Sequence, residues 1–251
     1  MLGIGRHLAT LREAKRRGAV DRFSTEFRDV READLVVIAT PVATVVPQVR
    51  KLLPFVRPGT VLTDVGSVKQ SILSGVARLK LPRSVSYVGG HPLAGSHKTG
   101  VRWAHPDLFK GSTCVLVPLG KASVASLQRM WCTTGARPIV LTAKTHDRAV
   151  ALISHLPHIL AHALVHSVAG HPQKKSLLPL LAGSFRDVTR VASSDPEQWQ
   201  EILQANAAEV RHAIHLFRRQ LSRLERHLSK ASLRALLKQS HTFRRPLFHG
   251  V

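Results

Sequence analysis

Four short apolar segments constrain the fold of this chain more than any other feature. They cover residues 35–39, 61–65, 85–88 and 114–117, and helix-like amphipathic stretches separate several of them. Apolar runs of this length predict buried strands, and intervening helices predict crossover connections between parallel strands. We therefore expect an α/β domain built on a parallel, helix-covered sheet.

The pattern changes near residue 144, after which the sequence shows long helical periods and no strand candidate. We expect one domain over residues 1–143 and an all-helical domain over residues 144–251. In its last long segment, apolar residues recur three and four positions apart and predict one seam along a helix: Val210, Ile214, Phe217, Leu221, Leu224 and Leu228. Such a seam packs either inside its own domain or against a second subunit.

The chain is strongly basic, with 37 Lys and Arg against 15 Asp and Glu and a formal net charge of +22. From Arg211 onward, ten basic residues accompany a single acid, Glu225. A charge this high attracts polyanions without specificity. The basic residues are spaced around a helix and are not interleaved with exposed aromatic residues, which favours a solvated face over a nucleic-acid platform.

Cysteine content and hydropathy exclude several classes of protein. Cys114 and Cys132 are the only cysteines, so neither a disulfide framework nor a CxxC metal site is available, and we expect both to be buried, reduced thiols. We expect no apolar run of the roughly 18 residues that a membrane span needs, and no signal peptide. The sequence therefore predicts a cytoplasmic protein with no membrane partner.

Polar or glycine residues follow three of the predicted strands. Thr40 and Pro41 follow the first strand, Gly66 and Ser67 the second, and two glycines and His91 the third. Because the carboxyl ends of parallel strands meet at one edge of a sheet, these residues predict a ligand pocket. The two glycines before His91 lack side chains and are expected to let a ligand approach the backbone.

Three strings carry the most specific signal in the sequence. They are TDVGSVK at residues 63–69, VGGHPLAGS at residues 88–96 and SHLPH at residues 154–158. Together they resemble the prephenate dehydrogenase family, including its arogenate-using relatives, from Gly3 to about Arg245. The resemblance implies a Rossmann-like domain, a helical dimerisation domain and oxidative decarboxylation of prephenate or arogenate by NAD or NADP.

The resemblance assigns roles at the predicted strand ends. It implies that His91 hydrogen-bonds the ring hydroxyl of the substrate and accepts its proton, a task suited to an imidazole near neutral pH. It places Ser67 between the substrate hydroxyl and the nicotinamide, and by itself Ser67 also reads as the N-cap of the following helix. Thr40, Pro41 and Gly66 are expected to bind the cofactor.

A further string, FRDVTRVA at residues 185–192, extends the resemblance into the helical domain. There the family segment implies that Arg190 grips a substrate carboxylate, and a planar guanidinium suits this task. The other residues that we expect to border the substrate are Ser96, Ser154, His158 and Trp199.

Four histidines, at positions 155, 158, 162 and 166, recur at helical spacing. Such spacing is compatible with zinc, but no carboxylate of the HExxH type accompanies it, and the SHLPH string accounts for the first two. We therefore expect no metal site. Asp147, which follows His146, is expected to order this histidine network.

Two features depart from the family pattern. His97 stands where the family commonly carries an acid, so a titratable base replaces an acidic gate. The sequence also contains no GxGxxG loop, although Gly3 to Gly5 read as the end of a strand and residues 8–17 as a helix closed by Gly18. We therefore expect a truncated Rossmann-like domain, explained first by a translation start assigned too late and second by decay of the enzyme.

Arg6 is the one clue to the choice of cofactor. It directly follows Gly3 to Gly5, which would end the second strand of the family's nucleotide-binding domain, where an acid would select NAD and a base would tolerate the phosphate of NADP. The sequence thus leans towards NADP over NAD.

The leading hypothesis is a homodimeric prephenate or arogenate dehydrogenase of tyrosine biosynthesis, and the residues do not separate the two substrates. The alternative is a non-catalytic basic remnant that binds nucleic acid or another polyanion, with steep salt dependence. The motif strings favour the enzyme, because generic polyanion binding makes no demand for them.

Overall fold

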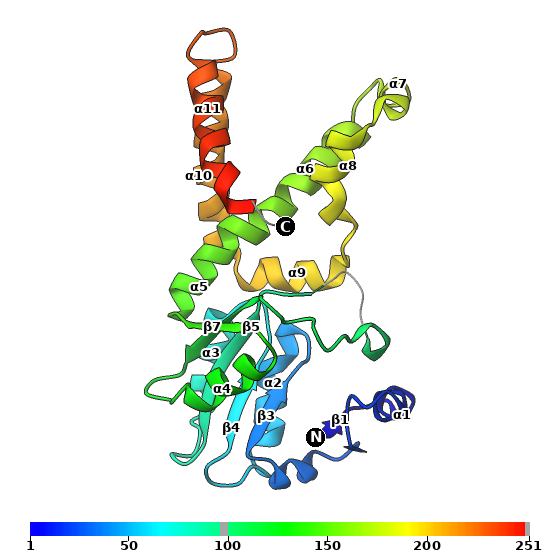
Figure 1. Cartoon of the computed structure of the whole chain (residues 1–251), viewed down its shortest axis with the longest axis vertical. Helices are drawn as coiled ribbons and strands as arrows, with labels where there is room; N and C mark the ends of the chain where they lie inside the picture. The colour runs from blue at the N-terminus through cyan, green and yellow to red at the C-terminus, as the bar shows by residue number, and fades with distance from the viewer. Residues whose placement is uncertain (96–99, 249–251) are drawn as a thin grey trace.

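The computed structural model describes residues 1–95 and 100–248. Its larger sheet has five strands in the order β3-β4-β5-β6-β7 (Figure 1). They are β3 (Leu35–Ile38), β4 (Val61–Asp64), β5 (Ser86–Pro92), β6 (Thr113–Pro118) and β7 (Arg137–Val140). The four predicted strands are confirmed, whereas the sequence did not predict β7, because an arginine and a proline open its short apolar run.

Helices cover both faces of this sheet. On one face, α2 (Val42–Leu52) and α3 (Gln70–Ala77) pack against the strands in one core, and on the other face α4 (Ala125–Thr133) packs in a second core. Along β6, Val115 belongs to the first core and Leu116 to the second. This period of two is the one expected of a strand that is buried on both faces.

The sheet is not wholly parallel, in contrast to the sequence prediction. β5 and β6 pair antiparallel, with His91 opposite Val115, while the other neighbouring strands pair parallel. A parallel partner needs a crossover that returns the chain to the starting edge. In the described part of the connection between β5 and β6 the only helix is a short 3-10 turn, Val101–Trp103, so the chain turns back along β5.

The first residues form a separate parallel pair of strands. β1 (Leu2–Ile4) pairs with β2 (Arg22–Ser24), and α1 (Leu8–Arg16) connects them, as the predicted strand end and helix require. Gly18, with a φ of +70°, follows the helix in the left-handed conformation that suits glycine. Within the residues that the structure describes, β3 pairs only with β4, so β3 is an edge strand, and its Val37 is 43% exposed.

One long helical run links the sheet to the remaining helices. It comprises α5 (Ala143–Val150), a π-helical turn (Ala151–His155) and α6 (Leu156–Ala169). By length and composition alone it is apolar enough to cross a membrane, and a third of its apolar window is buried in the fold. We expected no such run. Core helices of globular proteins share these properties, so this finding alone does not identify a membrane span.

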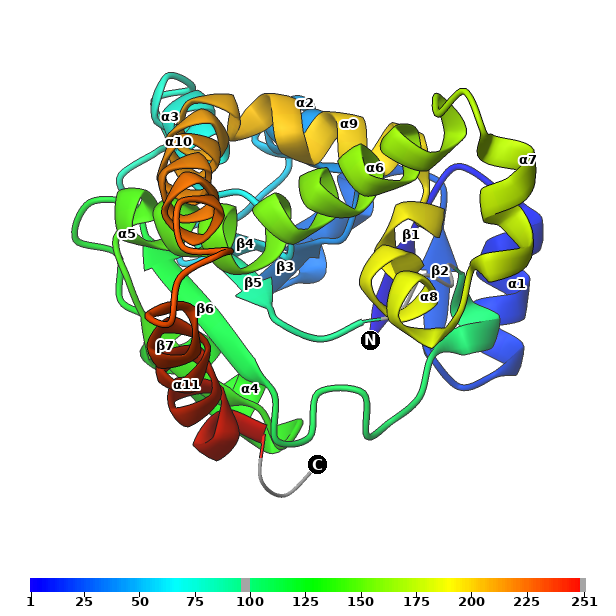
Figure 2. The ribbon, with the colours of Figure 1, turned by 90° about the horizontal axis from the view of Figure 1, so that it is seen from above.

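The remaining helices follow α6, and all of them except α9 (Pro196–Ala205) form two projecting arms with it (Figure 1). The others are α7 (Lys174–Leu177), α8 (Gly183–Thr189), α10 (Ala207–Glu225) and α11 (Leu233–Arg244). Figure 1 shows α10 and α11 as one arm and α6 with α7 and α8 as the other. From above, α9 lies over α2 and thereby joins the helical part to the sheet (Figure 2).

The predicted seam on α10 divides into a buried and an exposed half. Val210 is 6% exposed and packs with Ala151 and Leu156, whereas Leu221 is 54% and Leu228 69% exposed. The helix ends at Glu225, so the seam does not continue through Leu228 as predicted. Packing inside the domain therefore explains only the first half of the pattern.

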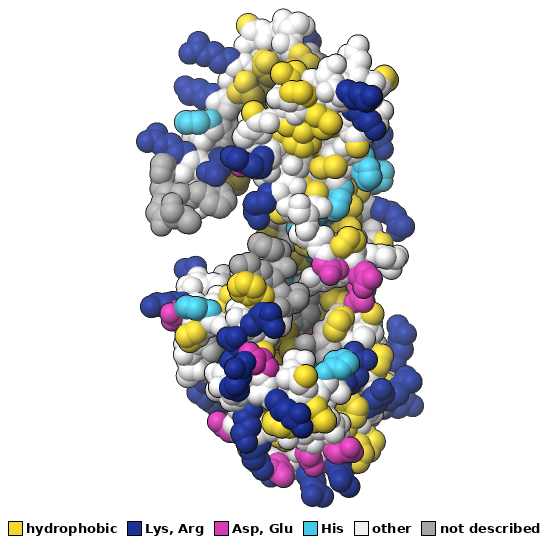
Figure 3. All heavy atoms as spheres, turned by 90° about the vertical axis from the view of Figure 1, so that its right-hand side faces the viewer, with side chains coloured by type: hydrophobic (Ala, Val, Ile, Leu, Met, Phe, Trp, Pro, Cys, Tyr) yellow, Lys and Arg dark blue, Asp and Glu magenta, His cyan; other side chains and the backbone are white. Residues whose placement is uncertain are grey.

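Exposed apolar side chains also gather on the second arm. Figure 3 shows many hydrophobic side chains over the upper, helical part of the molecule, and Lys and Arg across the face and edges of the lower part. The arm's exposed members include Leu178, Leu180 and Val188. Of the two cysteines, Cys114 is buried in β6 as predicted, but Cys132 is exposed on α4, because it follows the buried Trp131 by one position on the helix.

Candidate active site

The carboxyl end of β4 and the facing part of β5 hold a buried polar cluster. Asp64 accepts a hydrogen bond from the Tyr87 hydroxyl (2.6 Å) and forms an ion pair with the Lys69 ammonium. Lys69 also donates to the carbonyl oxygen of Gly90 (2.7 Å). Burial lowers the pKa of Lys69 against the opposing effect of Asp64, and burial together with Asp64 raises the pKa of Tyr87. This paired charge ties the loop between β4 and α3 to β5.

A second carboxylate, Asp147 of α5, joins the helical part to α3. It accepts hydrogen bonds from the backbone N–H groups of Lys69 (2.8 Å) and Gln70 (2.9 Å). These amides open α3, which has no side-chain cap from its own N-cap residue. Asp147 therefore supplies the cap from a distant segment, the task that Ser67 was predicted to perform.

His91 lies inside β5 and not after it as predicted, because the strand continues to Pro92. Its Nδ1 lies 2.7 Å from Nε2 of His146, and Nδ1 of His146 lies 2.6 Å from Oδ1 of Asp147. Burial, aided by the charges of His146 and Lys69, lowers the pKa of His91 to about 2. His91 is therefore neutral near pH 7, with an unprotonated ring nitrogen.

Polar and aromatic side chains continue this network into the helical part. Asn206 donates to the carbonyl oxygen of Asp147 (2.8 Å) and to Nδ1 of His155 (3.2 Å). Trp199 of α9 meets His155 edge to face and stacks on His158, with ring centroids 3.3 Å apart and planes inclined by 20°. Burial lowers the pKa of both histidines to about 4.

His158 has hydrogen-bonding capacity to spare. Its side chain is 9% exposed, and its buried Nδ1 has no hydrogen-bond partner among the described residues. Buried polar atoms are rarely left unpaired in folded proteins. The buried ring that stacks on Trp199 thus carries a nitrogen without a partner among the described residues.

Arg190 lines a cavity of about 520 Å³ at the end of α8. Its charge contributes to the lowered pKa of His158, so it extends the same network. In the described part of the chain no carboxylate pairs with Arg190, whereas the neighbouring Arg186 lies 3.7 Å from Asp187. The guanidinium of Arg190 can therefore meet an incoming carboxylate.

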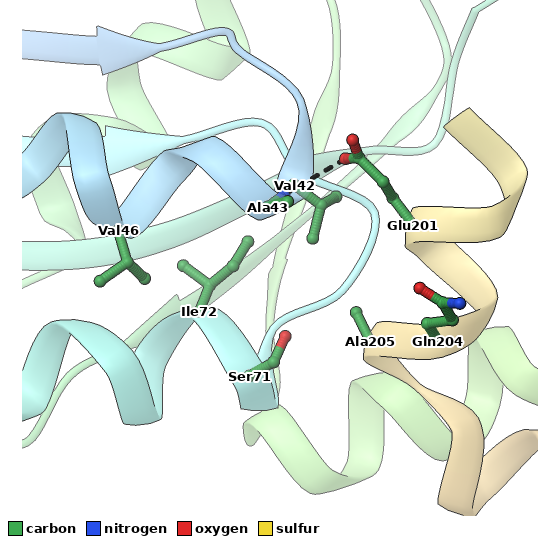
Figure 4. A pocket seen from close by; sticks show the side chains of 8 residues that line it. All are labelled: Val42, Ala43, Val46, Ser71, Ile72, Glu201, Gln204 and Ala205. Atoms are coloured by element: carbon green, nitrogen blue, oxygen red, sulfur yellow. Dashed lines mark hydrogen bonds between the residues drawn. The ribbon is translucent and has the colours of Figure 1, made fainter. Parts of the chain in front are cut away.

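A second cavity, of about 390 Å³, lies where α9 meets the ends of α2 and α3 (Figure 4). Val42 and Ile72 line its apolar side, and Glu201 reaches across to accept a hydrogen bond from the backbone N–H of Ala43 (3.3 Å). Like Asp147, Glu201 is a carboxylate of the helical part that caps a helix of the sheet part.

The glycines before His91 serve packing. A Cβ atom on Gly90 would lie 2.5 Å from the carbonyl oxygen of Asp64, and one on Gly89 would lie 2.9 Å from a methyl group of Leu73. Side chains at these positions would push β5 away from β4 and α3. The geometry thus explains both glycines without the close ligand approach that the sequence suggested.

The residues predicted to bind the cofactor do not all come together. Thr40 and Pro41 lie between β3 and α2, and Gly66 follows β4. Because β3 and β4 pair in parallel, all three residues lie at the carboxyl ends of these strands. A Cβ atom on Gly66 would lie 2.9 Å from Ile72, so this turn also requires glycine. Arg6 is exposed after β1, in the separate strand pair, and no described contact joins it to the other three.

Three serines, Ser67, Ser96 and Ser154, were predicted to lie at the substrate, and the structure describes two of them. Ser67 is half-buried in the loop between β4 and α3, and Ser154 is half-buried in the π-helical turn. Ser96 lies outside the described residues, as does His97.

Two family models match the chain. The model for the nucleotide-binding domain of prephenate dehydrogenase matches residues 1–140, and the model for its dimerization domain matches residues 142–241. The chain belongs to the prephenate dehydrogenase family.

This chain is similar to individual members of the family in both sequence and structure. The prephenate dehydrogenase of Lactococcus lactis is 32% identical over 225 residues, which cover 89% of this chain and 62% of that enzyme. The Aquifex aeolicus prephenate dehydrogenase, in complex with hydroxyphenyl propionate and NAD+, superposes with a TM-score of 0.90 at 28% identity, over 98% of this chain and 88% of that one. The Synechocystis arogenate dehydrogenase gives 0.86 at 29% identity, over 98% and 90%.

The chain is shorter than its curated relatives in this family. It spans 51%, 62% and 65% of the lengths of three of them.

Sequence reasoning missed part of the polar network that surrounds His91 in this family member. Asp64 and Lys69 stand in the TDVGSVK string but were not assigned roles, and His146 was noted only as the neighbour of Asp147. A signal was present, because a carboxylate at the end of an apolar strand needs a buried partner. The identity of that partner depends on which distant segments the fold brings together.

Proposed function

We propose that this chain is a prephenate or arogenate dehydrogenase, which oxidises and decarboxylates the cyclohexadienol ring of its substrate to an aromatic product. Membership of the family supports this proposal, and the observation that carries it is the hydrogen-bonded series from His91 through His146 to Asp147. A neutral, buried imidazole held in this way suits a proton acceptor.

His91 handles the proton of the ring hydroxyl. It accepts that proton as hydride leaves the same ring carbon, and it returns the proton to the ring oxygen once carbon dioxide departs. The electron pair of the broken carbon–carboxylate bond completes the aromatic ring, so no net proton is released. Ser67, in the loop beside β5, is proposed to hydrogen-bond the same hydroxyl.

Arg190 anchors the substrate through a carboxylate. A bidentate guanidinium pair supplies both affinity and orientation, and Arg190 has no competing carboxylate among the described residues. The unpartnered Nδ1 of His158 and the ring of Trp199 are proposed to border the bound ring, with Ser154 and Ser96 completing the surroundings.

The proposed cofactor is a nicotinamide dinucleotide, which accepts hydride when bound. Thr40, Pro41 and Gly66 fit its nicotinamide end, because they share the edge of the sheet at which α/β proteins bind such ligands. The A. aeolicus relative was crystallised with NAD+, which supports NAD for this chain. A preference for NADP would depend on Arg6 alone. We propose only that Arg6 tolerates the extra phosphate of NADP.

We further propose that the chain acts as a cytoplasmic homodimer assembled through its helical part. The match of residues 142–241 to a dimerization domain supports this assembly. Exposed apolar residues on both arms, such as Leu221 and Leu180, provide surface that a second copy can cover.

The test is the formation of reduced nicotinamide by the purified chain, supplied in turn with prephenate or arogenate and with NAD or NADP. We expect turnover with at least one pair, and its loss in His91→Asn. A matched control is His166→Asn, which changes an exposed histidine on α6. Salt-sensitive polyanion binding without turnover of any pair would instead support the non-catalytic alternative.

A further inference from the structure

One side chain, that of His146, connects His91 to the buried carboxylate of Asp147. We propose that His146 and Asp147 are positioning residues that fix the tautomer of His91, so that its Nε2 is the unprotonated nitrogen. The inference deepens the proposed function, which gives His91 the task of accepting a proton. The tautomer follows from the hydrogen bonds when His146 carries a single ring proton, and neither positioning residue has to touch the substrate.

Asp147 is fixed as an acceptor. Its carboxylate receives the backbone N–H groups of Lys69 (2.8 Å) and Gln70 (2.9 Å), and these groups can only donate. The third neighbour, Nδ1 of His146, lies 2.6 Å from the same oxygen that Lys69 contacts. An ionised carboxylate with two obligate donors requires a donor at this third position as well, so the proton of His146 is on Nδ1.

The tautomer of His146 then sets that of His91. When its single ring proton is on Nδ1, His146 presents a lone pair at Nε2, which lies 2.7 Å from Nδ1 of His91. His91 must donate across this distance, so its own proton is on Nδ1. The lone pair of His91 is therefore on Nε2, the nitrogen that can receive a proton from the substrate.

The same arrangement acts against burial only after His91 has accepted a proton. Burial, His146, Lys69 and His155 together lower its pKa to about 2, which makes the imidazole a weak base. When His91 accepts a proton, its Nδ1–H remains bonded to His146, and the negative charge of Asp147 lies behind His146. A buried carboxylate held by three donors cannot move away, so it stabilises the imidazolium as that charge forms.

Two substitutions of His146 separate positioning from packing. His146→Phe fills the same space but offers no acceptor to His91, whereas His146→Gln places an amide oxygen near the position of Nε2. We expect His146→Phe to lower kcat about 10- to 100-fold, part of the roughly 10²- to 10⁴-fold that a general base supplies, with KM unchanged. His146→Gln should recover most of this loss. Equal kcat in wild type and His146→Phe would overturn the proposal.

A second readout does not depend on turnover. The ¹⁵N resonances of the His91 ring, assigned by their absence in His91→Asn, report which nitrogen carries the proton. We expect a protonated Nδ1 and an unprotonated Nε2 in the wild type, and loss of this preference in His146→Phe. A proton on Nε2 in the wild type would refute the proposed tautomer. Failure of all substrates with the predicted tautomer intact would count against the proposed function alone.

Discussion

The surroundings of His91 and those of Arg190 differ in how firmly the fold holds them. Around His91, Asp64, Lys69, His146 and Asp147 are each at most 1% exposed, and every one of them is hydrogen-bonded. Arg190 is exposed, lines an open cavity and has no carboxylate partner in the described residues. The comparison indicates a division of tasks, in which a rigid junction performs the proton chemistry and a more open arm binds the substrate.

The largest effect on kcat is expected from a substitution of His91. His91→Asn should lower kcat by about 10²- to 10⁴-fold, because a positioned general base contributes about that much to rate. KM should change little, since Arg190 and His158 are left in place. Steady-state kinetics measure both constants, and a large rise in KM with an unchanged kcat would break the proposed division.

The buried histidines should make stability depend on pH. The folded pKa values of His91 (about 2) and His155 (about 4) lie below the ordinary value, so the unfolded chain binds more protons below about pH 6.5. Stability should be full above that pH and fall as the pH drops towards 4, by up to ~1.4 kcal/mol per pH unit for each histidine. Urea unfolding at several pH values tests this, and His155→Asn should reduce the slope.

Substitutions around Arg190 should change substrate binding. Arg190→Gln removes a charge-assisted contact of about 1.5–3 kcal/mol, so KM should rise roughly 10- to 100-fold while kcat changes less. Arg186→Gln is the comparison, because Arg186 lines the same cavity but lies 3.7 Å from Asp187. Equal effects of the two substitutions would show that only the overall charge of this helix matters.

Smaller effects, on stability, are expected from the apolar seam of α10, which has a buried half and an exposed half. Val210→Ala should destabilise the chain by about 1–3 kcal/mol, because it leaves a cavity in a buried cluster. Leu221→Ala should cost less than about 0.5 kcal/mol in the monomer, since that residue is 54% exposed. A large loss for Leu221→Ala at high protein concentration alone would place this residue in a dimer interface.

The smallest effect is expected at Arg6. Arg6→Asp should shift the relative kcat/KM for NADP and NAD towards NAD, because an acid repels the additional phosphate. An unchanged ratio would refute the role of Arg6 in the choice of cofactor.

The sequence predicted the local features better than the long-range contacts. Strand positions and the helix closed by Gly18 follow from apolar runs and turn chemistry, which act over a few residues. The antiparallel β6 depends on where a long connection returns, and the cap of α3 by Asp147 joins segments about 80 residues apart. Residue patterns carry little information about such pairings.

The candidate site shows the same limit. His91 stood out because of its neighbours in sequence, yet His146 completes its hydrogen bonding from a helix that begins beyond β7. The two glycines before His91 were predicted to admit a ligand. The structure requires glycine there for another reason, because Asp64 of β4 and Leu73 of α3 leave no room for a side chain. Motifs thus locate the chemistry, whereas packing decides which side chains support it.

The central claim is that His91 performs chemistry and Arg190 performs binding. It is tested most directly by the Kd of the turnover substrate, measured by calorimetry in the presence of the oxidised cofactor. His91→Asn should turn over about 10²- to 10⁴-fold more slowly than the wild type, so binding can be measured before much substrate reacts. The account predicts that His91→Asn binds the substrate with a Kd near the wild-type KM and that the His91→Asn, Arg190→Gln double variant binds it roughly 10- to 100-fold more weakly. Equal Kd values for the two variants would contradict it.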